Sequence, residues 1–328
     1  MSVKVKYSLS TKFPVLSGVP QGSVLGPILF LIFVNHICKD LSCKFMMFAD
    51  DLKIYFKIKL NNSNTSQDST SPTHQRNIDA LAQTASSWGL NMNSQKCVTL
   101  RFSRVKSISN PVYTLNNTLI PILNCQTDLG VSIDTDLKFH SHTSLTASKA
   151  GALVGNLLKC TLCREPEFMK SLYISNVRPV IDYCSPVWNS GYIHNLKLLE
   201  QVQRRFTKHI DGLKHLSYAE RLATLNLFSV KGRLLSSDLI KCWKIFHKQS
   251  SLKYSDFFTL APLSYLRGHS FKIFTPNVNT DIRKRSFAYR IINIWNSLSQ
   301  ETVNATSIET FKHNLHHELG DRLYDYHN

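Results

Sequence analysis

Two adjacent acids between two apolar runs constrain the fold of this chain more than any other feature. The stretch Phe48-Ala49-Asp50-Asp51 follows Lys44–Met47 and precedes Leu52–Phe56. This pattern predicts a β-hairpin whose tight turn presents both carboxylates. Divalent cations such as Mg²⁺ prefer carboxylate oxygens, and two such ions can hold the attacking and leaving oxygens of a phosphoryl transfer. A two-metal site of this kind needs a further carboxylate from a neighbouring strand, and residues 1–39 contain no Asp or Glu.

Length and charge limit the classes of protein to which the chain can belong. Its 328 residues suggest two or three domains, and an apolar fraction of 43% is enough for a buried core. The formal net charge of +17 predicts a polyanionic partner, either a nucleic acid or an anionic membrane surface. The alternative is a protein that exposes basic faces to solvent only.

The cysteines and the apolar runs add further expectations. The eight cysteines form no dense framework, so reduced thiols are expected. Cys160 and Cys163 form one C-x-x-C without a second pair at zinc-finger spacing, which makes zinc the weaker interpretation. The run Val24–Val34 is interrupted by Gly26 and Pro27 and is too short to span a bilayer, so we expect a buried helix there and no membrane partner. The N-terminus shows no signal-peptide pattern, which argues against secretion.

The periodicity of the sequence changes near residue 135. Before it, strands and helices alternate, and after about Phe139 helices dominate. The elements expected in the first part are strands at 3–9 and 12–16, a helix from 23 to about 39, the hairpin around the acids, and a polar surface loop or short disordered insertion at 59–73. They continue with a helix containing 78–88 that Gly89 ends, a strand at 96–102, a hairpin of strands 112–115 and 118–122 around Asn116–Asn117, and a strand at 129–133. The elements expected later are a helix with a buried face at 196–210, a capping box at 217–220, mixed structure at 250–280, and helices at 283–298 and 307–319.

Three stretches together resemble the reverse transcriptase of non-long-terminal-repeat (LINE-type) retrotransposons. Ser17–Pro27 (SGVPQGSVLGP) looks like palm motif B of that family, Phe48–Asp51 looks like motif C, and Gly89–Cys97 (GLNMNSQKC) is similar to motif D. Order and spacing match as well. Further stretches resemble the segment entering the thumb, the thumb and post-thumb helices and the tail of the family: 128–134, 177–179, 186–188, 199–205, 217–222, 295–296 and 307–312.

The resemblance implies an α+β fold made of a partial polymerase palm and a mostly helical thumb and C-terminal domain. Residues 1–135 would be the palm, with a small antiparallel sheet and packed helices, residues 136–250 a helical thumb-like domain, and residues 251–328 a helical or mixed tail. The expected partners of the complete enzyme are an RNA template, a DNA primer or target, and deoxynucleotide triphosphates. The oligomeric state stays open. The cytoplasm, the nucleus or both are the expected compartments.

The resemblance also implies roles for single residues. Asp50 would bind the catalytic Mg²⁺, which Mn²⁺ could replace, and Asp51 would be a second ligand or an electrostatic neighbour. Gln21 and Gly22 would lie along the nascent base pair, where a glycine allows close approach of the backbone. Lys96 would protonate or neutralise the leaving pyrophosphate, although a lone lysine is also common at a solvated surface.

Two basic surfaces are candidates for contact with nucleic acid. Between residues 191 and 250 there are eleven Lys and Arg against four Asp and Glu. Arg204, Arg205 and Lys208 project around the other sides of their helix, away from its apolar face, and backbone phosphates are natural partners for such a surface. The second candidate is Arg283–Arg285, with aromatic residues close by in sequence. For both surfaces the alternative is a solvated basic face.

The chain lacks a counterpart of motif A, whose aspartate is an essential metal ligand in this family, and of the fingers. The first acid, Asp40, falls between motifs B and C. We therefore expect a 5′-truncated reading frame, or part of one, that has the identity of an RNA-directed DNA polymerase with two-metal nucleotidyl transfer but is inactive as an isolated chain. Whether the isolated chain is an enzyme stays open. The alternative is a non-catalytic retroelement remnant that binds RNA or DNA.

Overall fold

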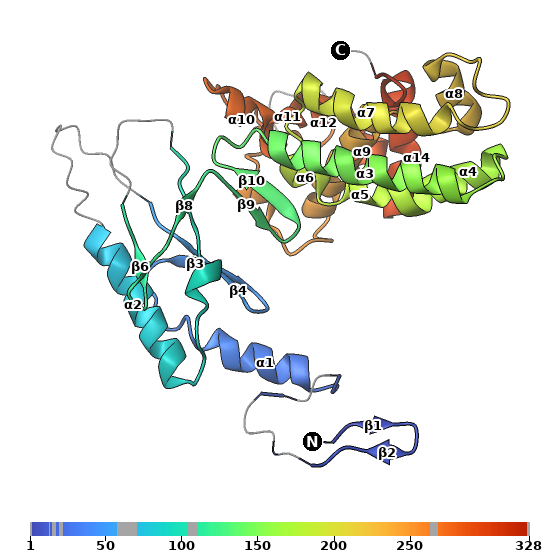
Figure 1. The fold of residues 1–328 in the computed structure, drawn as a ribbon. Coiled ribbons are helices and arrows are strands. Elements are labelled where there is room, and N and C mark those ends of the chain that lie inside the picture. The colour runs from blue at the N-terminus through green and yellow to red at the C-terminus, as the bar shows by residue number, and fades with distance from the viewer. Residues whose placement is uncertain are drawn as a thin grey trace. The chain divides into compact units, whose positions relative to one another are not determined.

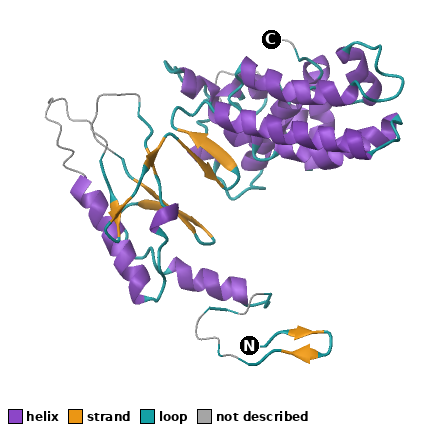
Figure 2. Cartoon of the chain, viewed as in Figure 1, coloured by secondary structure: helices purple, strands orange, loops and turns teal. Residues whose placement is uncertain are grey.

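The chain folds into two compact units. The computed structural model describes residues 2–12, 14, 18–19, 22–57, 71–103, 111–262 and 268–326. One unit is Met1–Leu123 and the other is Asn124–Asn328 (Figure 1). Helices and small two-stranded sheets make up the described residues, so the fold class is α+β (Figure 2).

The first unit combines short hairpins with two helices. Its elements are β1 (Lys4–Val5), β2 (Ser8–Leu9), α1 (Gly26–Asn35), β3 (Lys44–Phe48), β4 (Asp51–Tyr55), α2 (Ser71–Ser87), the 3₁₀ turn η1 (Ser94–Lys96), β5 (Thr99–Leu100), β6 (Thr114–Leu115), β7 (Thr118–Leu119) and β8 (Ile122–Leu123). The pairs β1–β2, β3–β4 and β6–β7 are antiparallel, and β5 pairs with β8 in parallel. The predicted hairpin around the two acids is confirmed. The predicted strand at 96–102 was too long, because residues 94–96 form the 3₁₀ turn.

Local sequence explains the turns of this unit. Gly89 follows α2 with φ +72°, a left-handed conformation that glycine adopts without strain, and the helix ends there as predicted. Asn116 and Asn117 connect β6 to β7 with φ +50° and +61°. Asparagine is one of the few residues that tolerate this conformation, so the predicted hairpin is confirmed. The predicted loop at 59–73 lies largely outside the described residues, and α2 already begins at Ser71.

The expected helix at Val24–Val34 forms, but the expectation that it is buried was wrong for most of its side chains. The helix α1 starts where Pro27 is tolerated, in the first turn, and the Gly26 N–H donates to Ser23 Oγ at 3.1 Å. Val34 packs into a small core with Leu81 of α2. One apolar stripe of α1 stays exposed, at Leu25 63%, Ile28 54%, Leu29 51% and Ile32 58%.

The second unit is mainly helical. Its elements are β9 (Cys125–Asp128), β10 (Val131–Asp134), α3 (His140–Cys160), α4 (Pro166–Leu172), the π-helical turn η2 (Tyr173–Val177), α5 (Arg178–Asp182), α6 (Ser185–Trp188), α7 (Ile193–Thr207), α8 (Tyr218–Leu225), α9 (Val230–Phe246), η3 (Tyr254–Asp256), α10 (Asp281–Arg285), α11 (Phe287–Arg290), α12 (Ile292–Ser297), α13 (Gln300–Val303), α14 (Ile308–Leu319) and η5 (Gly320–Leu323). The long helices α3 and α7 pack side by side (Figure 1). The predicted capping box of α8 is confirmed, since Ser217 and Glu220 cap each other's backbone N–H.

Two hydrophobic cores share the helix α9. Its first turns contribute Val230 and Leu234 to a core with α3, α5, α7 and α8. Its later turns contribute Trp243 and Phe246 to a second core that contains Trp295 and the C-terminal helices. Because α9 belongs to both cores, the helices before and after residue 250 form one unit.

The observed division therefore differs in position from the predicted segments 1–135, 136–250 and 251–328. The β9–β10 hairpin belongs to the second unit, because Val131 is part of its first core. The assignment of these segments to palm, thumb and tail stays a prediction. The predicted helix at 283–298 is broken into α10, α11 and α12, whereas the predicted helix at 307–319 is α14 with Ser307 as its N-cap. No helix in the described ranges is both long and apolar enough to cross a membrane.

Candidate metal and nucleic-acid sites

The two acids lie at the tip of the β3–β4 hairpin. Phe48 pairs with Asp51 across the strands, so Ala49 and Asp50 form the turn. Ala49 has φ +53°, which is uncommon for a residue with a side chain but is what a tight two-residue hairpin turn requires. Met47 and Leu52 anchor the inner face of the hairpin in the small core with α1 and α2. The turn is thus held on a packed base, while both carboxylates are exposed.

The two carboxylates at this turn are suitable ligands for a hard divalent cation, but a full metal site needs more ligands than these two. Within the described part of the chain, no cluster of three or more His, Cys, Asp or Glu side chains is placed to hold a metal ion. Mg²⁺ is often bound by one or two carboxylates, with waters and substrate phosphates completing its shell. Asp50 and Asp51 can supply those two carboxylates. Asp40 is exposed as well and joins no such cluster.

Of the two predicted motif B residues, the structure describes Gly22 only. Gln21 lies outside the described residues. Gly22 is exposed and has φ +84°, and a Cβ built on it would meet no other atom within 4 Å. Glycine is therefore required by the backbone conformation, and the open space above it would allow a ligand to approach the main chain.

Lys96 closes the 3₁₀ turn η1. Asn93 caps this turn, since its Oδ1 accepts from the Gln95 N–H at 3.0 Å. Cys97 packs with Met92 against the core around Ile78, which fixes the turn on α2. Lys96 itself is exposed. It lies in the first unit, as do Asp50, Asp51 and Gly22.

The second set of predicted residues lies on α7. Leu199, Val202 and Phe206 are buried, as the periodicity predicts. Arg204 and Arg205 are exposed, and so is Lys208, the residue after the helix. These three cations belong to the second unit, so the sequence-predicted residues are divided between the two units.

Aromatic rings hold Arg204 in place. Its guanidinium carbon lies 4.7 Å from the ring centroid of Tyr218 and 5.4 Å from that of Tyr326. The two rings also touch each other edge-to-face, with centroids 5.0 Å apart. Such contacts reduce the freedom of a long cationic side chain without neutralising it. Sequence reasoning missed Tyr326, because no local pattern relates it to a helix more than a hundred residues earlier.

A buried polar network fixes the inner face of α7. Gln203 Oε1 accepts from the Tyr173 hydroxyl at 2.7 Å and from Arg233 Nη1 at 3.1 Å. Arg233 Nε donates to Asp182 Oδ1 at 2.8 Å. Desolvation raises the pKa of Tyr173 to about 12, so this phenol remains a donor at any physiological pH. The network joins η2, α5, α7 and α9 and gives the cationic face of α7 a rigid base.

Glu200 connects α7 to the start of α9. Its carboxylate accepts from the Val230 N–H at 3.0 Å and the Lys231 N–H at 3.4 Å, and the Tyr218 hydroxyl donates to it as well. Burial raises the pKa of this carboxyl, and these donors oppose the shift. Glu200 therefore stabilises the first turn of α9, whose N-cap is Ser229.

The second candidate surface stays a prediction, and one of its three cations, Arg285, is paired within the unit. Arg285 bonds both carboxylate oxygens of Asp281 at 3.0 Å, and its guanidinium lies 4.0 Å from the ring centroid of Tyr192. Arg290 makes a bidentate pair with the buried Asp238, at 2.7 and 2.8 Å. These two arginines hold the unit together. Arg283 and Lys284 stay exposed.

Comparisons with known proteins agree with the motifs. A model of the family described as reverse transcriptase (RNA-dependent DNA polymerase) matches residues 2–128. The RNA-directed DNA polymerase from mobile element jockey of Drosophila melanogaster is 31% identical over 222 residues, which are 63% of this chain and 23% of that protein. The probable RNA-directed DNA polymerases from transposon X-element and transposon BS of the same species are 25% and 24% identical, over 64% and 71% of this chain and 23% and 26% of theirs.

The chain thus spans about a quarter of the length of the curated relatives it matches. No solved structure matches it significantly. The family match covers the hairpin with Asp50 and Asp51, and the relatives extend the similarity beyond it. Residues 2–128 accordingly match the reverse transcriptase family, and the chain is similar to RNA-directed DNA polymerases from mobile elements.

Proposed function

We propose that this chain contributes the Asp50–Asp51 metal ligands and a nucleic-acid-holding helical region to an RNA-directed DNA polymerase. One observation carries the proposal. The two carboxylates lie at the tip of a packed hairpin, inside the segment that matches the reverse transcriptase family. The substrates would be an RNA template, a DNA primer or target, and deoxynucleotide triphosphates.

In this proposal Asp50 and Asp51 hold Mg²⁺, or Mn²⁺ in its place. When bound, such ions would activate the primer 3′-hydroxyl and neutralise charge on the triphosphate. The hairpin orients both carboxylates, and the open backbone at Gly22 admits the nucleotide or template strand, with Gln21 beside it. Lys96 neutralises the leaving pyrophosphate. Arg204, Arg205 and Lys208 hold the phosphate backbone of the bound strand.

The polypeptide of residues 1–328 is proposed to be inactive by itself. The described residues gather no third carboxylate at the hairpin tip. A two-metal site needs a further carboxylate beside Asp50 and Asp51 to offset the charge of the second ion. Primer extension on an RNA template with Mg²⁺ and all four deoxynucleotides should give product at or near background. Template-dependent product that disappears in Asp50→Asn would contradict the inactivity.

A chimera tests the polymerase assignment separately. The matching segment of the Drosophila melanogaster jockey polymerase is replaced by the corresponding residues of this chain. We expect template-dependent extension by the chimera, loss of it in the chimera carrying Asp50→Asn, and retention in one carrying Asp79→Asn, an exposed acid on α2. A chimera that binds primer–template but never extends it, beside an active parent, would refute the assignment.

A binding role without catalysis is the second candidate. The exposed cations of α7 on their rigid base support it. In that case the isolated chain binds RNA or DNA with a steep dependence on salt, and Mg²⁺ changes the affinity little. Fluorescence anisotropy at several salt concentrations, with and without Mg²⁺, measures this. Salt-independent binding would contradict it.

A further inference from the structure

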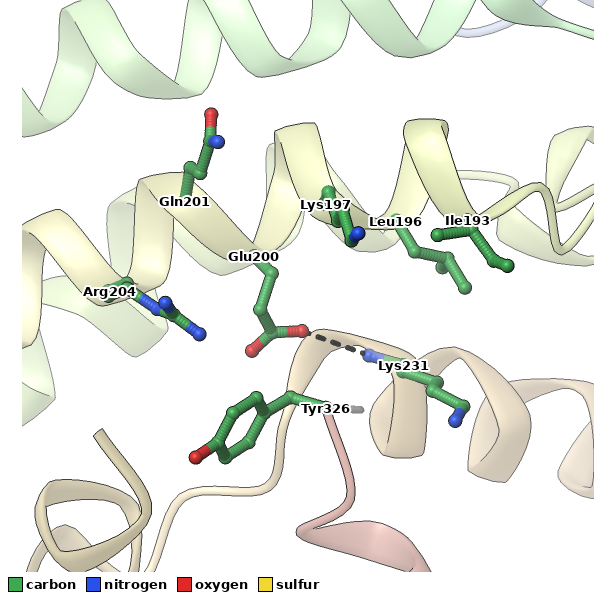
Figure 3. Close-up of a pocket in the computed structure, with 8 residues that line it drawn as sticks. All are labelled: Ile193, Leu196, Lys197, Glu200, Gln201, Arg204, Lys231 and Tyr326. Carbon is green, nitrogen blue, oxygen red and sulfur yellow. Dashed lines mark hydrogen bonds between the residues drawn. The ribbon is translucent and has the colours of Figure 1, made fainter. Parts of the chain in front are cut away.

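A pocket beside α7 is not explained by the polymerase chemistry. It has a volume of about 310 Å³ and lies in the second unit, between α7, the start of α9 and the chain end near Tyr326 (Figure 3). Sites for small molecules begin at about this size. Figure 3 shows Glu200 directed from α7 toward the start of α9, with Arg204 and Tyr326 beside it. Leu196 adds an apolar side chain to the wall.

The charge at the pocket favours an anion. Lys197, Arg204 and Lys231 line it. In the described part of the chain, neither Lys197 nor Arg204 has a carboxylate within ion-pair distance, whereas Lys231 pairs with Asp325 at 2.7 Å. The acid in the wall, Glu200, already accepts from backbone N–H groups and from a hydroxyl. An incoming phosphate would therefore meet Lys197 and Arg204, which no described carboxylate pairs with.

The walls also suit a flat ring. The Tyr326 ring and the Leu196 side chain form an apolar part of the lining, next to the stacked guanidinium of Arg204. Bases stack on aromatic rings and on guanidinium planes whatever their sequence, and this contact is available only to a base outside a duplex. An aromatic and an apolar wall together with phosphate-binding cations are the combination that one nucleotide requires.

The pocket is continuous with the cationic face of α7. Lys197 lies two helical turns before Arg204, on the same side of the helix, and Arg205 and Lys208 follow. Lys197 to Lys208 covers about 16 Å along the axis. A strand whose phosphates follow this row would pass the mouth of the pocket.

We propose that this pocket binds a single unpaired nucleotide of an RNA or DNA strand, with its base against Tyr326 and Leu196 and its phosphate at Lys197 and Arg204. The inference rests on the nucleic-acid-binding part of the proposed function and adds a subsite to it. The subsite distinguishes strands with a free base from perfect duplexes, which present only their phosphates.

The test compares two probes on the full chain. One is a short fluorescein-labelled single-stranded RNA, and the other is a blunt duplex of the same sequence. Tyr326→Ala should weaken binding of the single strand by about tenfold, while binding of the duplex changes by less than about twofold. Tyr326→Phe keeps the ring and should bind as the wild type does. Lys197→Gln should weaken the single strand more than Lys159→Gln, an exposed control on α3 that removes the same charge.

Crosslinking and competition complete the test. A 4-thiouridine in the single strand should crosslink to Tyr326 or to residues 193–204. Adenosine monophosphate should displace the crosslink at lower concentration than inorganic phosphate does. Equal losses on both probes, wild-type binding by a folded Tyr326→Ala, or displacement by phosphate and nucleotide alike would overturn the subsite. If the wild type binds neither probe, the nucleic-acid-binding function fails as well, whereas normal binding by both pocket variants refutes the subsite alone.

Discussion

At the scale of single residues, Gly232 of α9 lies in close contact with Leu323 near the C-terminus. A Cβ on this glycine would lie 2.1 Å from the carbonyl oxygen of Leu323, which no backbone shift of a few tenths of an ångström relieves. Gly232→Ala should therefore lower the free energy of unfolding by about 1–3 kcal/mol, as overpacking of a well-packed site does. Urea unfolding followed by circular dichroism measures it. Gly155→Ala is the matched control, because nothing lies within 4 Å of a Cβ there and alanine favours the helix by about 0.5–1 kcal/mol. A neutral Gly232→Ala would show that the chain end is not packed on α9.

His142 makes the stability of the second unit depend on pH. Its Nδ1 accepts from the Ser132 N–H at 3.2 Å, which requires the neutral ring, and desolvation lowers its pKa below the usual 6.5, helped by Lys149 and opposed by Asp134. As pH falls through 6.5 the unfolded chain takes up a proton that the folded chain resists, so stability is complete above 6.5 and is lost below it. Tm should thus fall between about pH 7.5 and 5.5.

His142→Asn tests the origin of that loss. The amide oxygen can accept at about the position of Nδ1 but does not titrate. The variant should show a smaller fall of Tm across the same range. A residual fall is expected, because desolvation also lowers the pKa of His269 and His316. An unchanged pH dependence would exclude His142 as a source.

At the scale of elements, the outer face of α7 allows a test of the proposed contact with nucleic acid. For duplex DNA, log K falls with log salt concentration, and each phosphate contact contributes about 0.9 to the steepness of that slope. The triple variant Arg204→Gln, Arg205→Gln and Lys208→Gln should therefore reduce the slope by about 2–3. Lys159, Lys248 and Lys253, all exposed elsewhere, provide a control triple with the same net charge. Equal slopes for the two triples would mean that α7 makes no specific contact with phosphates.

Elements whose contacts are close in sequence were predictable. The β3–β4 hairpin, the end of α2 at Gly89 and the buried face of α7 follow from alternation, turn residues and helical period. The exposed stripe of α1 and the pairing of Arg285 with Asp281 and Tyr192 were not, because each depends on which distant segment is or is not packed alongside. For the same reason the exposure of Asp50 and Asp51 agrees with the motif, while the pocket formed by α7 and Tyr326 could be found only in the fold.

At the scale of the whole molecule, the position of the boundary between the two units predicts which fragment of the chain folds by itself. The β9–β10 hairpin buries Val131 in the first core of the second unit, and Asp134 Oδ2 accepts from the Ser141 N–H at the start of α3. Residues 124–328 contain both cores and this hairpin, whereas a fragment that starts at Phe139 loses the hairpin. The lost contacts include the N–H bond to His142.

We expect fragment 124–328 to unfold cooperatively and to resist limited proteolysis. Fragment 139–328 should be less stable by at least about 1.5–3 kcal/mol, the contribution of burying one aliphatic side chain such as Val131, and His142 would lose its partner. Thermal unfolding of both fragments, followed by circular dichroism and compared with the full chain, measures the difference. Equal stability of the two fragments would place the hairpin outside the second unit. Failure of 124–328 to fold would mean that the helical unit depends on residues 1–123, and the basic face of α7 could then reach nucleic acid only as part of the intact chain.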